Sequence, residues 1–295
     1  MRPVIDCIIL FAACLVLAST VSAQQRPDFS KLMEAMERDG CTLQEGSGIK
    51  VCKRDYSVDG KNVEAISFQP RGAGPFPALL LIPGHATTAR DWIGNGLTYA
   101  RNGYAGLAVS QPGYGGSEGP GDYVGPKTIK VLIEGYRRLQ REPFVDAKRM
   151  GIVGYSRGGM AASLLALQLD DVKAVVMGGG VYDFKRLYDE TGLDGIRQNM
   201  KAETGMTEAA IRERSSILRM DKLKCPVLIL HGEKDINVPV SQARLLRDRL
   251  TALKKDFEIQ IFPDREHGIG PENLYKYSLD FLNRKLAGGP ATKKS

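Results

Sequence analysis

The stretch VGYSRGGM, residues 153–160, places Ser156 between two glycines in the pattern G-x-S-x-G. This pattern is typical of a sharp turn between a strand and a helix, where a serine hydroxyl stands exposed at the edge of a sheet. The flanking positions need glycine because backbone and helix approach too closely there for a Cβ atom. Residues 150–153 predict a strand, and residues 157–169 predict a buried helix. The stretch therefore predicts the strand–turn–helix unit of an α/β fold.

A second stretch, YGGSEG at residues 114–119, contains Ser117 in the same pattern. It follows QPGYGG and precedes EGPGDY, so neither a strand nor a helix is predicted beside this serine. Glycines in such surroundings are typical of a loop. We therefore assign the nucleophile of a single site to Ser156 and expect Ser117 to be a loop residue.

Along most of the chain, short apolar runs alternate with helical segments. Runs without polar alternation predict strands that are covered on both faces of a parallel sheet. The expected strands are residues 78–82, 105–109, 150–153, 174–177, 227–230 and 258–262, and the expected helices between them are residues 91–101, 127–140, 157–169, 241–253 and 273–286. This alternation predicts an α/β protein with a mostly parallel, doubly wound sheet.

The segment before the first of these strands predicts an antiparallel edge. A helix is expected at residues 30–38, ended by Gly40. The stretch IKVCKRDYSVDGKNVEAISFQP then predicts two strands joined at Asp59-Gly60, a strong hairpin signal. We expect this N-terminal hairpin to form an antiparallel edge of the sheet.

Residues 183–222 interrupt the alternation with a long, helix-prone segment between two strands. Such an insertion in a compact domain is usually a cap over the site or a surface excursion. We favour a helical cap. The end of the chain, AGGPATKKS at residues 287–295, is expected to be a flexible tail.

A serine hydroxyl needs a histidine to take its proton and a carboxylate to orient that histidine. In this kind of fold the acid and then the histidine follow the serine along the chain. His267 lies on a predicted loop after the last strand, and Asp235 lies on the loop after the strand that ends near His231. Glu233 and Asp264 are alternative acids. His231 is expected to support its loop.

The negative charge that develops on a carbonyl oxygen needs two backbone N–H donors. One belongs to Arg157, the residue after the proposed nucleophile. The other is expected in the turn Pro83-Gly84-His85-Ala86, where we choose the N–H of His85, with Ala86 next. His85 is thus proposed for its backbone and not for its ring. An ordinary strand-to-helix loop is the alternative.

The stretches VGYSRGG, LILHGEKDINVP and EHGI, at these spacings, resemble the catalytic domain of the prolyl oligopeptidase family of α/β-hydrolases. They are also similar to dienelactone-hydrolase-like serine esterases. The resemblance covers residues 60–286 and implies an α/β-hydrolase fold, with one domain expected over residues 24–295. It implies Ser156, Asp235 and His267 as a catalytic triad, the same three residues that the pattern analysis selects.

These inferences predict a serine hydrolase that cleaves ester or amide bonds through an acyl-enzyme and without a cofactor. Carboxylesterase-like activity on small esters is preferred, because an activated ester needs less help in positioning than an amide. A compact serine peptidase acting on short peptides is the first alternative, and a non-catalytic binding protein on a hydrolase fold is the second. A metal-dependent hydrolase is disfavoured, because the chain has only three histidines.

Four aromatic residues near predicted strand ends are candidates for an acyl or leaving-group pocket. Packing beneath a loop is the other explanation for each of them. They are Trp92, Tyr114, Tyr155 and Tyr182.

Residues 1–23 predict a secretory signal peptide, with Arg2, an uncharged apolar run and then Val21-Ser22-Ala23. An uncleaved anchor is the alternative, but the run is short for a membrane span of about 20 residues. We expect cleavage, no stable membrane span afterwards, and a secreted or periplasmic protein.

The cysteines and the net charge bear on disulfide bonds and on possible partners. Cys41 and Cys52 are candidate disulfide partners in an oxidising compartment, whereas Cys225 is expected to be a small buried residue. The net charge of +7 comes from scattered basic residues, without a basic stripe that carries aromatic residues. No nucleic-acid partner is therefore expected.

Overall fold

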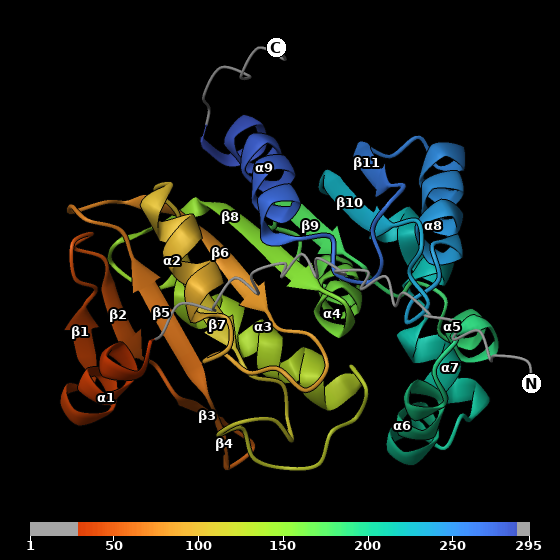
Figure 1. Ribbon diagram of the computed structural model, residues 1–295, viewed down its shortest axis with the longest axis horizontal. Helices are drawn as coiled ribbons and strands as arrows, with labels where there is room; N and C mark the ends of the chain where they lie inside the picture. Colours follow the sequence, from red (N-terminus) through yellow and green to blue (C-terminus); the bar gives the residue numbers. More distant parts are fainter. Residues whose placement is uncertain (1–28, 288–295) are drawn as a thin grey trace, which may run out of the picture.

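The computed structural model describes residues 29–287. The expected signal peptide at residues 1–23 lies outside the described residues, as do residues 288–295 of the expected tail. Within the described part, strands and helices alternate along the chain (Figure 1).

A mixed sheet of nine strands runs through residues 29–287, in the order β1-β2-β5-β7-β6-β8-β9-β10-β11. The strands are β1 (Cys41–Leu43), β2 (Lys50–Lys53), β5 (Ala65–Gln69), β6 (Phe76–Ile82), β7 (Ala105–Val109), β8 (Val145–Tyr155), β9 (Ala174–Gly178), β10 (Val227–Gly232) and β11 (Phe257–Phe262). The strands from β7 to β11 in this order pair parallel, whereas β1, β2 and β5 pair antiparallel. The prediction of a mostly parallel sheet is confirmed.

The predicted hairpin forms, but it stands apart from the large sheet. Its strands, β3 (Tyr56–Val58) and β4 (Lys61–Val63), pair as a separate two-stranded ribbon. The turn residues Asp59 and Gly60 have φ angles of 52° and 75°. Positive φ at both central positions is the type I′ geometry that Asp-Gly favours. The antiparallel edge of the large sheet is made instead by β1, β2 and β5, which flank the ribbon in sequence.

Helices cover both faces of the sheet (Figure 1). One face carries α1 (Ser30–Asp39), α2 (Ile93–Arg101), α9 (Pro271–Leu282) and its π-helical extension η2 (Asn283–Ala287). The other face carries α3 (Pro126–Gln140), α4 (Arg157–Ala166) and α8 (Ser241–Ala252). This three-layer arrangement explains why the central strands are apolar without alternation, since both of their faces are covered.

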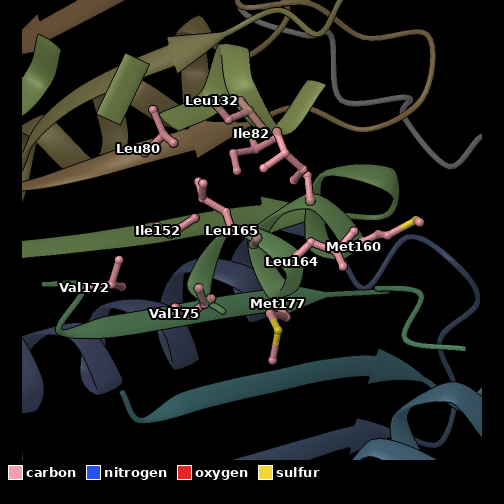
Figure 2. Close-up of a cluster of buried hydrophobic side chains, with 14 of the residues drawn as sticks. Leu80, Ile82, Leu132, Ile152, Met160, Leu164, Leu165, Val172, Val175 and Met177 are labelled. Atoms are coloured by element: carbon pink, nitrogen blue, oxygen red, sulfur yellow. The ribbon is translucent and has the colours of Figure 1, made fainter. Parts of the chain in front are cut away.

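The strand β6 shows how one apolar run supplies two cores. Leu79 and Leu81 pack in the cluster under α2 and α9, whereas Leu80 and Ile82 pack in the cluster under α3 and α4. All four side chains are fully buried, because successive residues of a strand point to opposite faces. Figure 2 shows the second cluster, in which Leu80 lies among side chains from β8, β9, α3 and α4.

The insertion at residues 183–222 lies between β9 and β10, as predicted, and it is helical. It contains α5 (Phe184–Glu190), α6 (Asp194–Thr204), α7 (Glu208–Arg214) and the 3-10 helix η1 (Ser216–Lys222). The side chains of Asp183 and Thr207 accept hydrogen bonds from backbone N–H groups in the first turns of α5 and α7. Such caps fix where these short helices begin.

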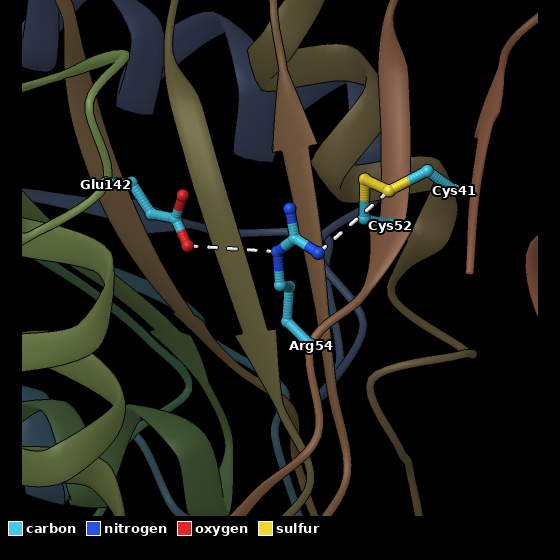
Figure 3. The surroundings of a disulfide bond; sticks show 4 residues. All are labelled: Cys41, Cys52, Arg54 and Glu142. Atoms are coloured by element: carbon cyan, nitrogen blue, oxygen red, sulfur yellow. Dashed lines mark hydrogen bonds and ion pairs between the residues drawn. A yellow bond between two sulfur atoms is a disulfide. The ribbon is translucent and has the colours of Figure 1, made fainter.

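The structure joins Cys41 and Cys52 in a disulfide bond. The two residues are directly opposed across β1 and β2, which brings their side chains together on one face. Figure 3 shows Arg54 beside the bond, with its Nη1 atom 3.9 Å from Cys41 Sγ and its Nε atom 3.7 Å from a carboxylate oxygen of Glu142. Cys225 is a buried free thiol, as expected.

Candidate active site

Ser156 occupies the sharp turn between β8 and α4. Its backbone has a φ of 57° and a ψ of −123°, a strained conformation for a residue other than glycine. A Cβ atom at Gly154 would overlap the backbone of Gly158, and a Cβ atom at Gly158 would overlap the carbonyl of Ile82. The two glycines of the pattern are therefore required by close backbone contact.

A continuous chain of hydrogen bonds joins Ser156, His267 and Asp235. His267 Nε2 lies 2.8 Å from Ser156 Oγ, and His267 Nδ1 lies 2.7 Å from Asp235 Oδ2. The three residues come from the end of β8, the loop after β10 and the loop after β11, which meet at the carboxyl edge of the sheet. A hydroxyl, an imidazole and a carboxylate in this order form the arrangement that activates a serine for attack on a carbonyl carbon.

Asp235 is held as a carboxylate by its surroundings. It is buried, and its Oδ1 atom accepts hydrogen bonds of 2.9 Å from the backbone N–H groups of Asn237 and Val238. Burial alone would raise the pKa of Asp235, but the hydrogen bonds from His231 and His267 outweigh burial and lower it to about 2. The group that faces His267 Nδ1 is therefore ionised at neutral pH.

The other candidates for the acid, and the second histidine, take part in other contacts. Glu233 pairs with Arg244 at the surface, and the exposed Asp264 lies 3.6 Å from Lys234 Nζ. His231 is fully buried and places its Nε2 atom 2.7 Å from the carbonyl oxygen of Val238. Its Nε2–H thus holds the loop that carries Asp235, the supporting position expected from the sequence.

The two residues chosen for an oxyanion hole are both neighbours of Ser156. Gly84 packs against Ser156, since a Cβ atom at Gly84 would lie 3.3 Å from Ser156 Cβ, and His85 follows it directly. Arg157 is the first residue of α4, where backbone N–H groups have no partner inside the helix. Within residues 29–287, neither His85 nor Arg157 donates its backbone N–H to a protein acceptor.

The ring of His85 has contacts that sequence reasoning did not predict. Arg157 Nη1 donates to the Tyr114 hydroxyl at 2.8 Å, and that hydroxyl lies 2.9 Å from His85 Nδ1. His85 Nε2 lies 3.2 Å from the side-chain amide of Asn199 in α6. Burial lowers the pKa of His85, and the charge of Arg157 lowers it further. The ring is thus a neutral link between the turn after β6 and the insertion.

The side chain of Arg157 is a second feature that the sequence did not reveal. It is buried, pairs with Glu203 in α6 and lies over the ring of Tyr123, with its Cζ atom 4.4 Å from the ring centre. Glu203 also accepts a hydrogen bond from the backbone N–H of Tyr123 at 2.6 Å. A single helix of the insertion therefore contacts the side chains of both residues chosen for the oxyanion hole.

A pocket of about 520 Å³ opens beside Ser156 and His267. Of the four aromatic candidates, Trp92 and Tyr155 line it. The Tyr155 hydroxyl also donates to the carbonyl of His267 and accepts from the N–H of Ile269, which fixes the loop that carries the histidine. Tyr114 lies instead beside the ring of His85.

The assignment of Tyr182 to a substrate pocket is wrong. Its side chain is fully buried in the core cluster under α3 and α4. The backbone carbonyl of Tyr182 accepts from the N–H of Ile217 in η1, and its N–H donates to Gln242 in α8. Contacts with the insertion and α8 cover this strand end, and the sequence pattern did not reveal them.

Ser117, the second serine of the same pattern, has a structural position. It is buried, accepts from the backbone N–H of Glu64 at 2.9 Å and donates to the carbonyl of Ser110 at 2.8 Å. The buried carboxylate of Glu64 also accepts from the Ser110 hydroxyl and from the N–H of Gly116. Ser117 therefore holds a loop in place, as its non-helical surroundings predicted.

Within residues 29–287, His, Cys, Asp and Glu side chains do not gather in a group of three or more that would suit a metal ion. Among the same residues, no helix has the length and apolar character needed to cross a membrane.

The chain is similar to several curated proteins and solved structures. It is 29% identical to the uncharacterized peptidase YtmA of Bacillus subtilis over 74% of this chain and 86% of that protein. It is 27% identical to human dipeptidyl peptidase 8 over 54% of this chain and only 18% of that protein.

Two solved structures show the same fold. The acylaminoacyl peptidase of Pyrococcus horikoshii superposes with a TM-score of 0.74 at 19% identity, over 91% of this chain and 45% of that one. The acetyl xylan esterase of Paenibacillus sp. R4 superposes with a TM-score of 0.70 at 18% identity, over 89% and 96% of the two chains. The chain thus spans less than half of some relatives and nearly all of others.

The family follows from a match to a sequence model that covers more than half of the chain. The sequence model of the prolyl oligopeptidase family matches residues 122–289, which include Ser156, Asp235 and His267. Peptidases and esterases both occur among the similar proteins and structures. This chain belongs to the prolyl oligopeptidase family, has the α/β-hydrolase fold and is a serine hydrolase.

Proposed function

We propose that the protein is a carboxylesterase that uses Ser156, His267 and Asp235 as its catalytic triad. The observation that carries this proposal is the hydrogen-bonded chain from Ser156 Oγ through both ring nitrogens of His267 to the buried Asp235. The chain places a base within reach of the hydroxyl proton and a carboxylate behind that base.

The proposed reaction has two halves. Ser156 Oγ attacks the ester carbonyl carbon while its proton passes to His267 Nε2, and the carbonyl oxygen gains negative charge. The N–H groups of His85 and Arg157 stabilise that charge. The bond to the alcohol oxygen then breaks, its electron pair stays on that oxygen, and His267 returns the proton to release the alcohol.

The second half regenerates the enzyme. A water molecule attacks the acyl-enzyme carbonyl and gives a proton to His267. The bond to Ser156 Oγ then breaks, and the serine regains its proton from the histidine. One ester and one water thus give one carboxylic acid and one alcohol. Asp235 stays ionised throughout and stabilises the positive charge on the imidazole.

The pocket beside Ser156 supports a preference for esters over peptides. Its lining contains no Asp, Glu, Lys or Arg among residues 29–287, and such a side chain would be needed to hold the charged end of a short peptide. Acetyl xylan esterases among the structural neighbours add support. An activated ester also needs less remote binding energy than an amide.

A compact serine peptidase is the second candidate, because several relatives are named as peptidases. Steady-state kinetics with short-chain aryl esters and with aminoacyl and dipeptidyl anilides separate the two. We expect kcat/KM for the esters to be at least about 100-fold higher, which is a difference of about 2.7 kcal/mol in barrier. Comparable values for a dipeptidyl anilide would make the protein a peptidase.

We also propose that the protein is exported through the predicted signal peptide at residues 1–23. The bond between Cys41 and Cys52 supports this, because disulfides persist in oxidising compartments. Expression of the full chain, followed by fractionation and N-terminal sequencing, tests it. A chain that begins at Gln24 outside the cytoplasm is expected. An intact N-terminus in the cytoplasm would contradict it.

A further inference from the structure

The pocket beside Ser156 is bounded on one side by the loop that follows the catalytic histidine. Gly268, Ile269 and the start of α9 form this part of its wall, together with the ring of His267 itself. The rest comes from the segment after β6, which contributes Trp92 and Asn95, and from Tyr155. The pocket therefore lies against the group that moves the proton.

The chemistry of proton transfer decides which half of an ester this pocket can hold. His267 Nε2 takes the proton of Ser156 and must deliver it to the departing oxygen, so that oxygen has to come within hydrogen-bond distance of Nε2. The group attached to that oxygen then extends away from Ser156 along the His267 side. We propose that the pocket is the leaving-group site and that it selects esters of neutral, flat, apolar alcohols; this inference rests on the proposed esterase function.

The lining favours an aromatic ring without charge. Trp92 and Leu274 are each 7% exposed, and Tyr275 adds a third apolar surface. Since the lining within residues 29–287 contains no Asp, Glu, Lys or Arg, an ionised alcohol portion would lose its hydration without gaining a partner from these side chains. A volume of about 520 Å³ is ample for one or two fused rings.

The assignment has a kinetic consequence. The alcohol leaves when the first half of the reaction ends, so the pocket can distinguish one alcohol from another only while the acyl-enzyme forms. All acetate esters pass through the same acetyl-enzyme. A change in the pocket must therefore alter kcat/KM in a way that depends on the alcohol, whereas the deacylation rate of a given variant must be the same for every acetate ester.

Gly268 offers a way to fill the pocket without strain. It lines the pocket, a Cβ atom there meets no atom within 4 Å, and its φ is not positive. Gly195 in α6 has the same two properties but does not line the pocket, so Gly195→Leu is a matched control for Gly268→Leu.

The experiment uses two ester series and the purified full-length or signal-cleaved protein. Ethyl, benzyl and 2-naphthylmethyl acetate vary the alcohol while keeping it primary, and ethyl acetate, butyrate and octanoate vary the acyl chain. Gly268→Leu is expected to lower kcat/KM for 2-naphthylmethyl acetate at least about tenfold more than for ethyl acetate. In Gly268→Leu, acetyl-enzyme hydrolysis is expected to be equally fast for all three acetates, and the ratios of kcat/KM within the acyl-chain series are expected to match those of the wild type. Gly195→Leu is expected to change neither series.

Each other outcome has a defined meaning. Selective loss in the acyl-chain series would make the pocket an acyl site and overturn the inference. If Gly268→Leu slows all esters equally, Asn95→Leu decides, because Asn95 lines the pocket from α2, in a different segment from His267. If Asn95→Leu also lowers kcat/KM by the same factor for every alcohol, the inference is wrong. If the wild-type protein cleaves none of these esters, both the proposed esterase function and this inference are wrong.

Discussion

Glu203 in the insertion pairs with Arg157, the residue directly after Ser156, and Arg157 Nη1 donates to Glu203 Oε1 at 2.9 Å. The guanidinium is almost fully buried, so its charge depends on this carboxylate for compensation. The same helix, α6, reaches the ring of His85 through Asn199. The insertion therefore contacts the side chains of both residues of the proposed oxyanion hole.

Glu203→Gln should destabilise the protein because it leaves the buried charge of Arg157 without a carboxylate. We expect the free energy of unfolding to fall by about 3 kcal/mol and kcat/KM for an aryl ester to fall at least about tenfold. Glu213→Gln is the control, since Glu213 pairs with Arg214 but its side chain is 52% exposed. Urea unfolding and ester hydrolysis measure both variants. If Glu203→Gln and Glu213→Gln cause equally small losses of stability and of kcat/KM, the Arg157–Glu203 pair is not needed for either property.

Ser156→Ala and Ser117→Ala distinguish the two serines of the same sequence pattern. Ser156→Ala should abolish fluorophosphonate labelling and lower turnover by about four orders of magnitude or more, because the nucleophile is removed. Ser117→Ala should remain labelled and lose about 1–2 kcal/mol of stability, because Ser117 makes two buried hydrogen bonds. Labelling that is lost only in Ser117→Ala would reverse the assignment.

Asp235→Asn tests the acid of the proposed triad. Turnover should fall on the order of 10⁴-fold with the fold preserved, because an amide holds the imidazole of His267 in the wrong tautomer. Glu233→Gln and Asp264→Asn serve as controls and should keep wild-type rates, since both side chains lie at the surface in other pairs. A loss of less than about tenfold in Asp235→Asn would move the role to another carboxylate.

Asp235 should also make folding stability depend on acid pH. Its pKa falls from an ordinary 3.8 to about 2 in the folded protein, so its stabilising effect is complete above pH 4 and is lost as the pH falls through 2. Between pH 6 and pH 2.5 the wild type should therefore lose about 1.5 kcal/mol more than Asp235→Asn. Urea unfolding at both pH values gives this difference. The same loss in both proteins would mean that the pKa of Asp235 is not depressed.

Removal of the disulfide should destabilise the N-terminal edge of the sheet. The paired cysteines are 11 residues apart, and a closed loop of this size contributes about 3 kcal/mol in the chain-entropy account. Cys41→Ser combined with Cys52→Ser should show this loss in urea unfolding, with Cys225→Ala as the control that keeps the bond. In protein over residues 24–295 that is unfolded but not reduced, alkylation should modify Cys225 alone. Modification of all three cysteines would show that Cys41 and Cys52 are not bonded.

The sequence alone predicted the alternation of strands and helices along the chain, the sharp turn at Ser156, and the loops after two strands that carry Asp235 and His267. These features are encoded locally. Apolar runs, turn glycines and the ends of strands lie within short contiguous stretches, and parallel strands bring their carboxyl ends to one edge of the sheet. The same local logic placed Ser117 in a loop, because no strand or helix was predicted beside it.

The tertiary structure alone decided how distant side chains meet. The contact of His85 with Asn199 joins residues 114 positions apart, and that of Arg157 with Glu203 joins residues 46 positions apart. The burial of Tyr182 under the insertion is of the same kind. Periodicity specifies which residues turn inward, but the partner of a buried polar group depends on how separate elements pack. The side of Ser156 on which the pocket opens depends on that packing as well.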